Sequence, residues 1–189
     1  MNNYEYIIAC LPVPEAAGAL DADSLIEAIR SQCSPADNKL IDLLVSGFDP
    51  QNLTAELYTL AQASRNAFIR EYMFWDLRVR NTKTEFLNAR LSRPAGTDLI
   101  DLPGSLEFDD KPQVQAVLSN PDILERERGL DDLMWKKADE LTQLHVFDMD
   151  VILAFIAKIK ITDRWNRLDP QTGRAMFRTL VEEIRQTRD

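Results

Sequence analysis

The chain has 189 residues, of which 45% are hydrophobic and 28% are charged, and these values are typical of one globular domain that buries its own core. Its formal net charge of −9 at pH 7 argues against general nucleic-acid binding, because phosphate contacts require a basic surface. The start of the sequence lacks the basic residues and long apolar run of a signal peptide, and the longest nearly apolar run, Met149–Ala157, is too short to cross a bilayer. We therefore expect a single cytoplasmic domain over residues 1–189, without a membrane span of its own.

The first part of the chain is predicted to be helical after a short apolar arm. With only 6 glycines and many Leu, Ala, Arg and Glu residues, the composition favours an all-α fold of about six or seven helices. Tyr4–Leu11 is apolar and aromatic, so we expect either a short extended segment or a terminal arm tucked against the core. Helices are then predicted to begin at the capping residues Asp21 and Ser34, and the second of them ends at Gly47.

A long amphipathic stretch occupies the middle of the chain. Thr54 is predicted to cap a helix that buries Leu57 and Leu60. Ser64–Leu91 follows, and its apolar residues recur at helical spacing. The sequence leaves open whether one helix covers both segments or whether Ser64 caps a second helix, because a single helix would be long for a globular domain.

Residues 93–111 are predicted to form a loop. They contain two prolines, two glycines and five acidic residues, a mixture that interrupts helices and keeps a segment at the surface. We expect a mobile acidic connection here, followed by a short helix at 112–118.

Three further helices are predicted beyond this loop. Asn120–Pro121 combines a capping residue with a proline at the first helical position, and the helix that it begins is expected to bury Leu124. Asp148 is predicted to cap the next helix, whose apolar run has no polar face and should lie at the centre of the core. Asp169–Pro170 is predicted to begin the last helix.

The stretch at 64–92 differs in charge from the rest of the chain, since it holds six basic and three acidic residues. One face is apolar at helical spacing: Phe68, Tyr72, Trp75, Val79 and Phe86. Asp76 and Arg80 lie four residues apart on a second face and are expected to pair. Arg78 and Arg90 lie off that row and are predicted to project outward. The stretch is therefore either a solvated helix face or an interaction surface.

Catalytic signatures are missing from the sequence. His145 is the only histidine, whereas a zinc site requires several His or Cys ligands at short spacing. Asp148 and Asp150 lack further oxygen ligands at EF-hand spacing, and helix capping explains Asp148. We expect no catalytic residue, no cofactor and no metal site, and hence no enzyme. A buried carboxylate with a raised pKa, lining a large cleft, would revive the hypothesis of an enzyme.

Residues 120–184, which include the segments LERERGLDDLMW and ITDRWNRLD, resemble the C-terminal half of a bacterial all-helical family of unknown function. Genes of that family accompany those of a V-type (archaeal-type) ATP synthase. The segments YEYIIACLP and SPADNKLIDLLVSGFDPQNL resemble the same family, so the similarity covers nearly the whole chain. The region between Asn52 and Ser64 looks shorter than in that family.

The family is distantly similar to the C (or d) subunit of V-type ATPases, a helical socket that sits on the membrane rotor ring and receives the central shaft. That socket carries a helix motif of an acidic residue, then Asn-Leu-Lys, then Leu-Arg. The segment WDLRVRNTKTEFLNAR offers matching residue types in the same order: Asp76, Asn81, Lys83, Leu87 and Arg90. The spacing differs from the motif, Thr82 replaces its leucine, and the chain is much shorter than a full socket subunit.

The resemblance implies a non-catalytic structural and coupling subunit of a V-type ATP synthase, a complex that transports protons or sodium. Its partners would be the central-stalk and rotor-ring subunits, and it would reach the cytoplasmic face of the membrane only through them. The residues selected for this interaction are Trp75, Asp76, Arg78, Arg80, Asn81, Lys83 and Arg90. The alternative is a cytosolic adaptor or assembly factor that acts transiently on the ATPase or on another protein partner.

Overall fold

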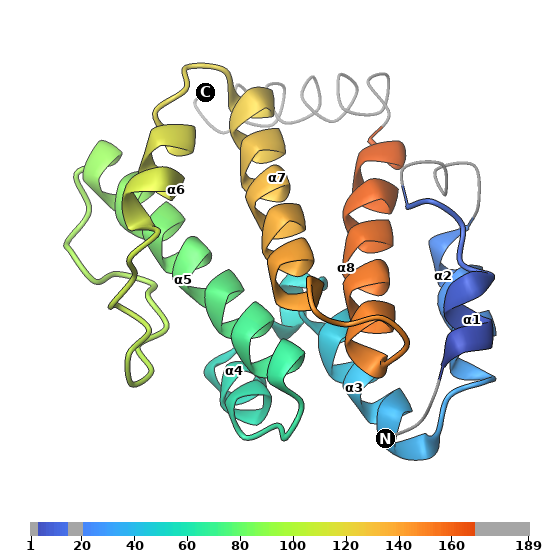
Figure 1. The fold of residues 1–189 in the computed structure, drawn as a ribbon. Coiled ribbons are helices and arrows are strands. Elements are labelled where there is room, and N and C mark those ends of the chain that lie inside the picture. The colour runs from blue at the N-terminus through green and yellow to red at the C-terminus, as the bar shows by residue number, and fades with distance from the viewer. Residues whose placement is uncertain (1–3, 15–20, 169–189) are drawn as a thin grey trace, which may run out of the picture.

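The computed structural model describes residues 4–14 and 21–168. Within these ranges the chain forms eight α-helices, one short 3-10 helix and no β-strand (Figure 1), which confirms the all-α fold. The helices are α1 (Glu5–Ala9), α2 (Ala22–Arg30), α3 (Pro35–Ser46), the 3-10 helix η2 (Pro50–Asn52), α4 (Ala55–Gln62), α5 (Ala67–Arg90), α6 (Lys111–Leu118), α7 (Ile123–Thr142) and α8 (Met149–Asn166). The helix predicted from Asp169–Pro170 lies outside the described residues.

The N-terminal arm is helical, so the prediction of an extended segment is wrong and that of a tucked arm is confirmed. Tyr4 and Ile7 are only 6% and 7% exposed. The Tyr4 amide donates a hydrogen bond to the carbonyl of Phe147 at 3.0 Å, and its hydroxyl donates to Asp37. Burial of one apolar side of a single helical turn therefore outweighs the low intrinsic stability of so short a helix, and it brings the number of described helices to eight.

Side-chain caps set most helix starts where the sequence predicts them. Asp21, Ser34 and Thr54 each accept a hydrogen bond from a backbone amide in the first turn of α2, α3 and α4. The start of α7 differs from the prediction: Asp122 accepts bonds from two amides of its first turn. Asn120–Pro121 lies just before it, where the Asn120 side chain instead accepts from the Asp122 amide.

α4 and α5 are separate helices, which answers the question that the sequence left open. Asn66, and not Ser64, caps α5 by accepting a hydrogen bond from the Ile69 amide at 2.8 Å. Arg70 donates to the carbonyl of Ser64 at 2.8 Å, which satisfies a backbone group in the turn. The break lets α4 fold back against α5.

The core is built on α8 and α5. Every side chain of Ile152–Ala157 is at most 6% exposed, as predicted, and on α5 the rings of Phe68 and Tyr72 stack at 5.2 Å. Leu60 and Leu124, which the sequence predicts to be buried, are 62% and 50% exposed. In α4 the buried residues are Leu57, Tyr58 and Ala61, and burial in α7 begins only at Leu130. Neither α8 nor any other helix in the described ranges has the length and hydrophobicity needed to span a membrane.

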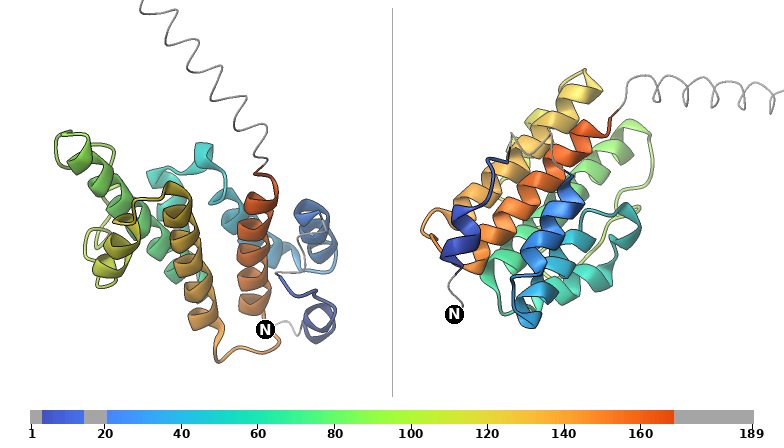
Figure 2. Two further views of the ribbon diagram at one scale, coloured as in Figure 1. Left: turned by 90° about the horizontal axis from the view of Figure 1, so that it is seen from above. Right: turned by 90° about the vertical axis from the view of Figure 1, so that its right-hand side faces the viewer.

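The helices pack in a row of antiparallel and crossing neighbours. α8 contacts α7, α3 and α2, and α5 contacts α4, α6, α7 and α3. Figure 2 shows α7 and α8 in the middle, with α5 and α6 on one side and α1 and α2 on the other. A Cβ at Gly129 of α7 would lie 2.7 Å from a methyl carbon of Val117, so this glycine permits the close approach of α6. In this arrangement α5 packs against α7 and faces α8 across a small cavity.

Candidate functional site

The seven residues selected from the sequence lie along α5 and take part in three arrangements. Three of them contact the connection between α5 and α6: Trp75, Arg78 and Asn81. Three others line a cavity between α5, α7 and α8: Asp76, Arg80 and Lys83. The exposed Arg90 lies near the end of the helix, with its guanidinium carbon 4.5 Å from the ring centre of Phe86.

Residues 91–110, between α5 and α6, form an irregular connection that lies along α5 (Figure 1). The Asn81 side chain donates a hydrogen bond to the carbonyl of Ile100 at 2.9 Å and accepts one from its amide at 3.2 Å. The Trp75 indole donates to Asp110 at 2.9 Å. These contacts attach the connection to the helix, whereas the sequence predicts a mobile loop there.

Arg78 is part of this attachment and does not project freely outward, which corrects the prediction. Its Nη2 donates to the carbonyl of Gly104 at 3.0 Å. Its guanidinium carbon lies 4.4 Å from the ring centre of Phe74, a distance at which the ring face attracts a cation. Arg78 therefore binds its own chain along one side of the guanidinium group.

Asp76 is the centre of a buried polar contact between α4 and α5. Its Oδ2 accepts hydrogen bonds from the Tyr58 hydroxyl and from Arg80 Nε, both at 2.7 Å, so the predicted pair with Arg80 is confirmed. Burial and the nearby carboxylate both raise the pKa of Tyr58, which keeps its hydroxyl protonated and able to donate. Burial alone would lower the pKa of Arg80, but the charge of Asp76 outweighs it and the net pKa is raised.

A second set of charged groups, from α5, α7 and α8, lines the same cavity. Lys83 of α5 pairs with Glu127 of α7 at 2.5 Å. Arg164 of α8 pairs with Asp131 of α7 at 2.6 Å, and the Trp165 indole donates to the same Asp131 oxygen at 2.7 Å. These contacts tie α5 to α7 and α7 to α8 around one space.

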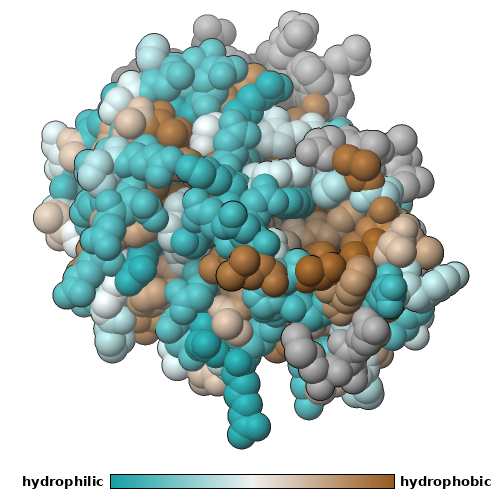
Figure 3. Space-filling model, viewed as in Figure 1, coloured by the Kyte–Doolittle hydropathy of each residue, from teal (hydrophilic) through white to brown (hydrophobic). Residues whose placement is uncertain are grey.

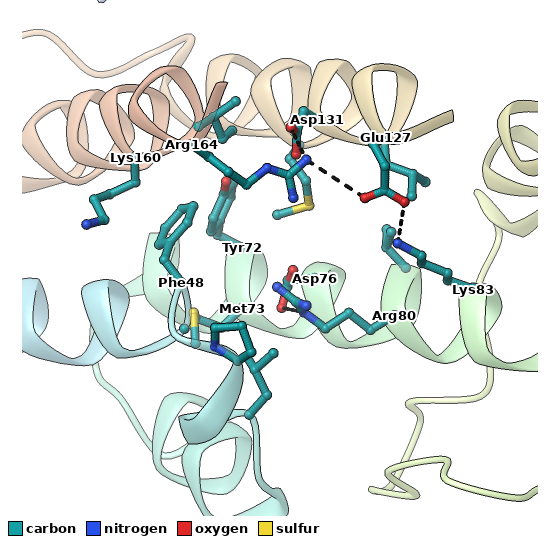
Figure 4. A pocket seen from close by; sticks show the side chains of 17 residues that line it. Phe48, Tyr72, Met73, Asp76, Arg80, Lys83, Glu127, Asp131, Lys160 and Arg164 are labelled. Carbon is teal, nitrogen blue, oxygen red and sulfur yellow. Dashed lines mark hydrogen bonds and ion pairs between the residues drawn. The ribbon is translucent and has the colours of Figure 1, made fainter. Parts of the chain in front are cut away.

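The cavity between these walls has a volume of about 180 Å³ (Figure 4). Tyr72 lines it and is 1% exposed, and its hydroxyl has no hydrogen-bond partner within the described part of the chain. Burial raises the pKa of Asp131, and the charge of Arg164 opposes this only in part. Asp131 is thus a partly buried carboxylate, with a side chain 13% exposed, whose pKa is raised and which lines a space smaller than the roughly 300 Å³ or more of most ligand pockets.

A separate cluster lies at the start of α8. His145 Nδ1 is 2.5 Å from Asp148 Oδ2 and 3.8 Å from Asp150 Oδ2. Asp148 also caps α8 through its other oxygen, as predicted, and Asp150 accepts a hydrogen bond from the Asn66 side chain. The three residues offer ligand atoms within 4.8 Å of one another, but hydrogen bonds within the chain already engage all three side chains. Through Asn66 and Asp150 the cluster also joins the start of α5 to the start of α8.

The pKa of His145 is expected to lie above its ordinary value of 6.5, because its ring hydrogen-bonds to Asp148 and both aspartates favour the charged imidazole. A raised folded-state pKa means that His145 stabilises the fold fully below about pH 6.5 and that this contribution is lost as pH rises through the folded-state pKa. A proton NMR titration measures the value directly, because the chain has one histidine. Asp148→Asn keeps a capping side chain but removes the charge, so it should lower the pKa of His145; an unchanged pKa would contradict the assignment.

The loop between α7 and α8 (residues 143–148) presents apolar side chains to solvent. Leu144, Val146 and Phe147 are 93%, 60% and 44% exposed. Figure 3 shows hydrophobic residues gathered across the part of this face where Figure 1 places the loop. Single exposed apolar residues are common, but several in one short loop are typical of a protein contact.

Comparison with known proteins finds a family-model match over just under half of the chain. Residues 97–188 match a family model described as "Protein of unknown function (DUF2764)". No curated protein matches the chain, and no solved structure does. The match covers the same C-terminal half as the resemblance noted for residues 120–184, and it agrees with a family of unknown function.

Sequence reasoning missed the partners that α5 meets across the fold. Tyr58, Asp131 and Arg164 contribute as much to the site as the residues selected on α5. A usable signal was the four-residue spacing of Glu127 and Asp131, which places both carboxylates on one face of α7. The spacing does not reveal which helix that face meets.

Proposed function

We propose that this chain is a non-catalytic structural subunit of a V-type ATP synthase that links the central shaft to the membrane rotor ring. The association with the ATPase rests on the sequence resemblance, and the observation in the structure that supports a contact role is the exposed apolar loop at residues 143–148. The mechanism is mechanical, because a subunit in this position transmits torque through a body that does not deform.

The packing of the helices is consistent with such a body. Ion pairs join α5 to α7 through Lys83 and Glu127, α7 to α8 through Asp131 and Arg164, and α2 to α8 through Asp23 and Lys160. Each pair alone contributes little at the surface. Together with the shared core of α5, α7 and α8, they oppose relative movement of the central helices.

The contact surface that we assign to the partner differs from the one selected in the sequence. Trp75, Asp76 and Asn81 are buried, so they hold the fold together and offer little area to another protein. Leu144 and Val146 are exposed at the end of the central α7–α8 hairpin. Burial of apolar area of this kind contributes about 25 cal/mol per Å² to association before the costs of binding are subtracted.

The test is an affinity purification of the tagged chain from its native host at low salt, with subunit stoichiometry measured by mass spectrometry. We expect stoichiometric recovery of the ATPase shaft and rotor-ring subunits. The double variant Leu144→Asp/Val146→Asp should reduce that recovery at least about tenfold, because two charges would enter the interface. Leu60→Asp, at another exposed leucine, is the matched control and should leave recovery unchanged.

Two results would contradict the proposal. Recovery of ATPase subunits well below stoichiometry would favour the adaptor or assembly factor. Recovery of none of them under gentle conditions would remove the ATPase from the proposal altogether. Circular dichroism of each variant separates a lost contact from a lost fold.

A further inference from the structure

Three side chains at the start of α8 direct one atom each toward a common point. His145 Nδ1 lies 2.5 Å from Asp148 Oδ2 and 3.8 Å from Asp150 Oδ2, and the three atoms all lie within 4.8 Å of one another. The side chains are 35%, 15% and 12% exposed, so the point is partly buried but open to solvent. One imidazole nitrogen and two carboxylate oxygens form a mixed donor set that suits divalent transition metals.

The other oxygen of each carboxylate is held by the fold. Asp148 Oδ1 accepts hydrogen bonds from the backbone amides of Asp150 at 3.1 Å and Val151 at 3.4 Å. Asp150 Oδ1 accepts one from the side chain of Asn66, which caps α5 through its own oxygen. Contacts of this kind orient metal ligands in proteins. They leave both Oδ2 atoms facing His145.

The two carboxylates have no permanent cation beside them. In the part of the chain that the structure describes, neither Asp148 nor Asp150 pairs with a lysine or an arginine, and their shared partner is the ring of His145, which is charged only when protonated. The cavity beside the cluster is lined by one further carboxylate, Asp37, and by one guanidinium group, Arg65. Neighbouring carboxylates repel each other when both are ionised. A divalent cation between them would balance both charges.

The distances between the donor atoms are close to those that an ion requires. Donors at about 2.1 Å from a tetrahedral or octahedral metal lie about 3.0–3.4 Å apart. The observed separations of 2.5 and 3.8 Å lie on either side of this range, so an ion would replace the hydrogen bond between His145 and Asp148 after small side-chain movements. The sequence predicts no metal site, because neither a zinc nor an EF-hand spacing is present. The donors come together in the turn that begins α8.

We propose that His145, Asp148 and Asp150 bind one divalent transition-metal ion, with Zn²⁺ as the representative, through one nitrogen and two oxygens. Zn²⁺ fits better than Mg²⁺ or Ca²⁺, because the latter two select oxygen ligands whereas imidazole suits zinc. Three protein ligands leave a fourth position for water, and this position faces the cavity of about 260 Å³ beside the cluster. The proposal stands independently of a role in an ATP synthase.

The experiment titrates the full chain, freed of metal with a chelator, with Zn²⁺ and follows the imidazole signals of His145 by NMR. The chain has one histidine, so these signals have a single source. We expect them to shift and to reach a plateau at one equivalent of Zn²⁺. Mg²⁺ at the same concentration should leave them unchanged, because it selects sites made of oxygen alone. Isothermal titration calorimetry measures the stoichiometry and the dissociation constant.

Asp150→Asn removes one charged ligand and leaves the helix cap at Asp148 in place. We expect the affinity for Zn²⁺ to fall at least about tenfold, because loss of even an outer contact of a metal ligand costs about 10–100-fold. Asp101→Asn makes the same change at an exposed aspartate in the connection between α5 and α6, and this matched control should bind as the wild type does. If Asp150→Asn fails to fold, the imidazole signals of the wild type still decide whether His145 is a ligand.

Several results would overturn the proposal. Imidazole signals that do not move in the presence of one equivalent of Zn²⁺ would exclude His145 as a ligand. Equal affinity of Asp150→Asn and the wild type would place the ion elsewhere on the chain. Loss of binding in Cys10→Ser would place it at that exposed thiol. Equal responses to Mg²⁺ and Zn²⁺ would mean attraction of any divalent cation to acidic groups and not a site built on the imidazole.

Discussion

Leu153→Ala is expected to destabilise the protein by about 2–5 kcal/mol. Leu153 is 0% exposed and lies in the second turn of α8, the helix that contacts α7, α3 and α2. Truncation removes the buried methyl groups and leaves a cavity that several helices would have to fill by moving together, so relaxation is limited. Urea denaturation followed by circular dichroism measures the change in the free energy of unfolding.

Leu144→Ala is the matched control, because it makes the same chemical change at a side chain that is 93% exposed. It should alter the free energy of unfolding by less than about 0.5 kcal/mol. A similar loss for both variants would mean that α8 is not the central helix of the core. A much smaller loss for Leu153→Ala than about 2 kcal/mol would mean that neighbouring helices collapse onto the vacated space.

Local features of this fold were predictable from the sequence because neighbours in the chain determine them. Ser34, followed by Pro35, marks the start of α3, and its hydroxyl accepts the bond from the Asp37 amide that the pattern predicts. The apolar run in α8 has no polar face and is buried as expected. In each case the physical cause lies within about one or two helical turns.

Contacts between distant segments were not predictable, because they depend on how the helices are placed. Asn81 looks like a solvated helix residue, yet it is 5% exposed and binds both backbone groups of Ile100. Leu124 fits an apolar spacing, yet it is 50% exposed, and burial in α7 begins only at Leu130. A periodic pattern identifies a face but not what covers it.

Asp76 makes one contact that the sequence predicts and one that it does not. Its replacement is expected to have the second large effect on stability. The spacing predicts its pair with Arg80, whereas the bond from Tyr58 arises only because α4 folds back against α5. Asp76→Ala leaves the Tyr58 hydroxyl and a guanidinium group without their acceptor. We expect a loss of about 2–3 kcal/mol, below the range for fully buried pairs because the Arg80 side chain is 43% exposed.

Arg93→Ala provides the comparison, because it breaks the pair with Asp98 in which both side chains are well exposed, and it should cost under about 1 kcal/mol. The double variant Tyr58→Phe/Asp76→Ala should be less destabilised than the sum of the single changes, since the phenylalanine has no hydroxyl left to satisfy. Strict additivity in urea denaturation would show that the two residues do not interact. A destabilisation of the double variant smaller than the sum of the single changes would mean that the hydroxyl and the carboxylate act together. Their contact would then fix α4 against α5 and so position one wall of the cavity.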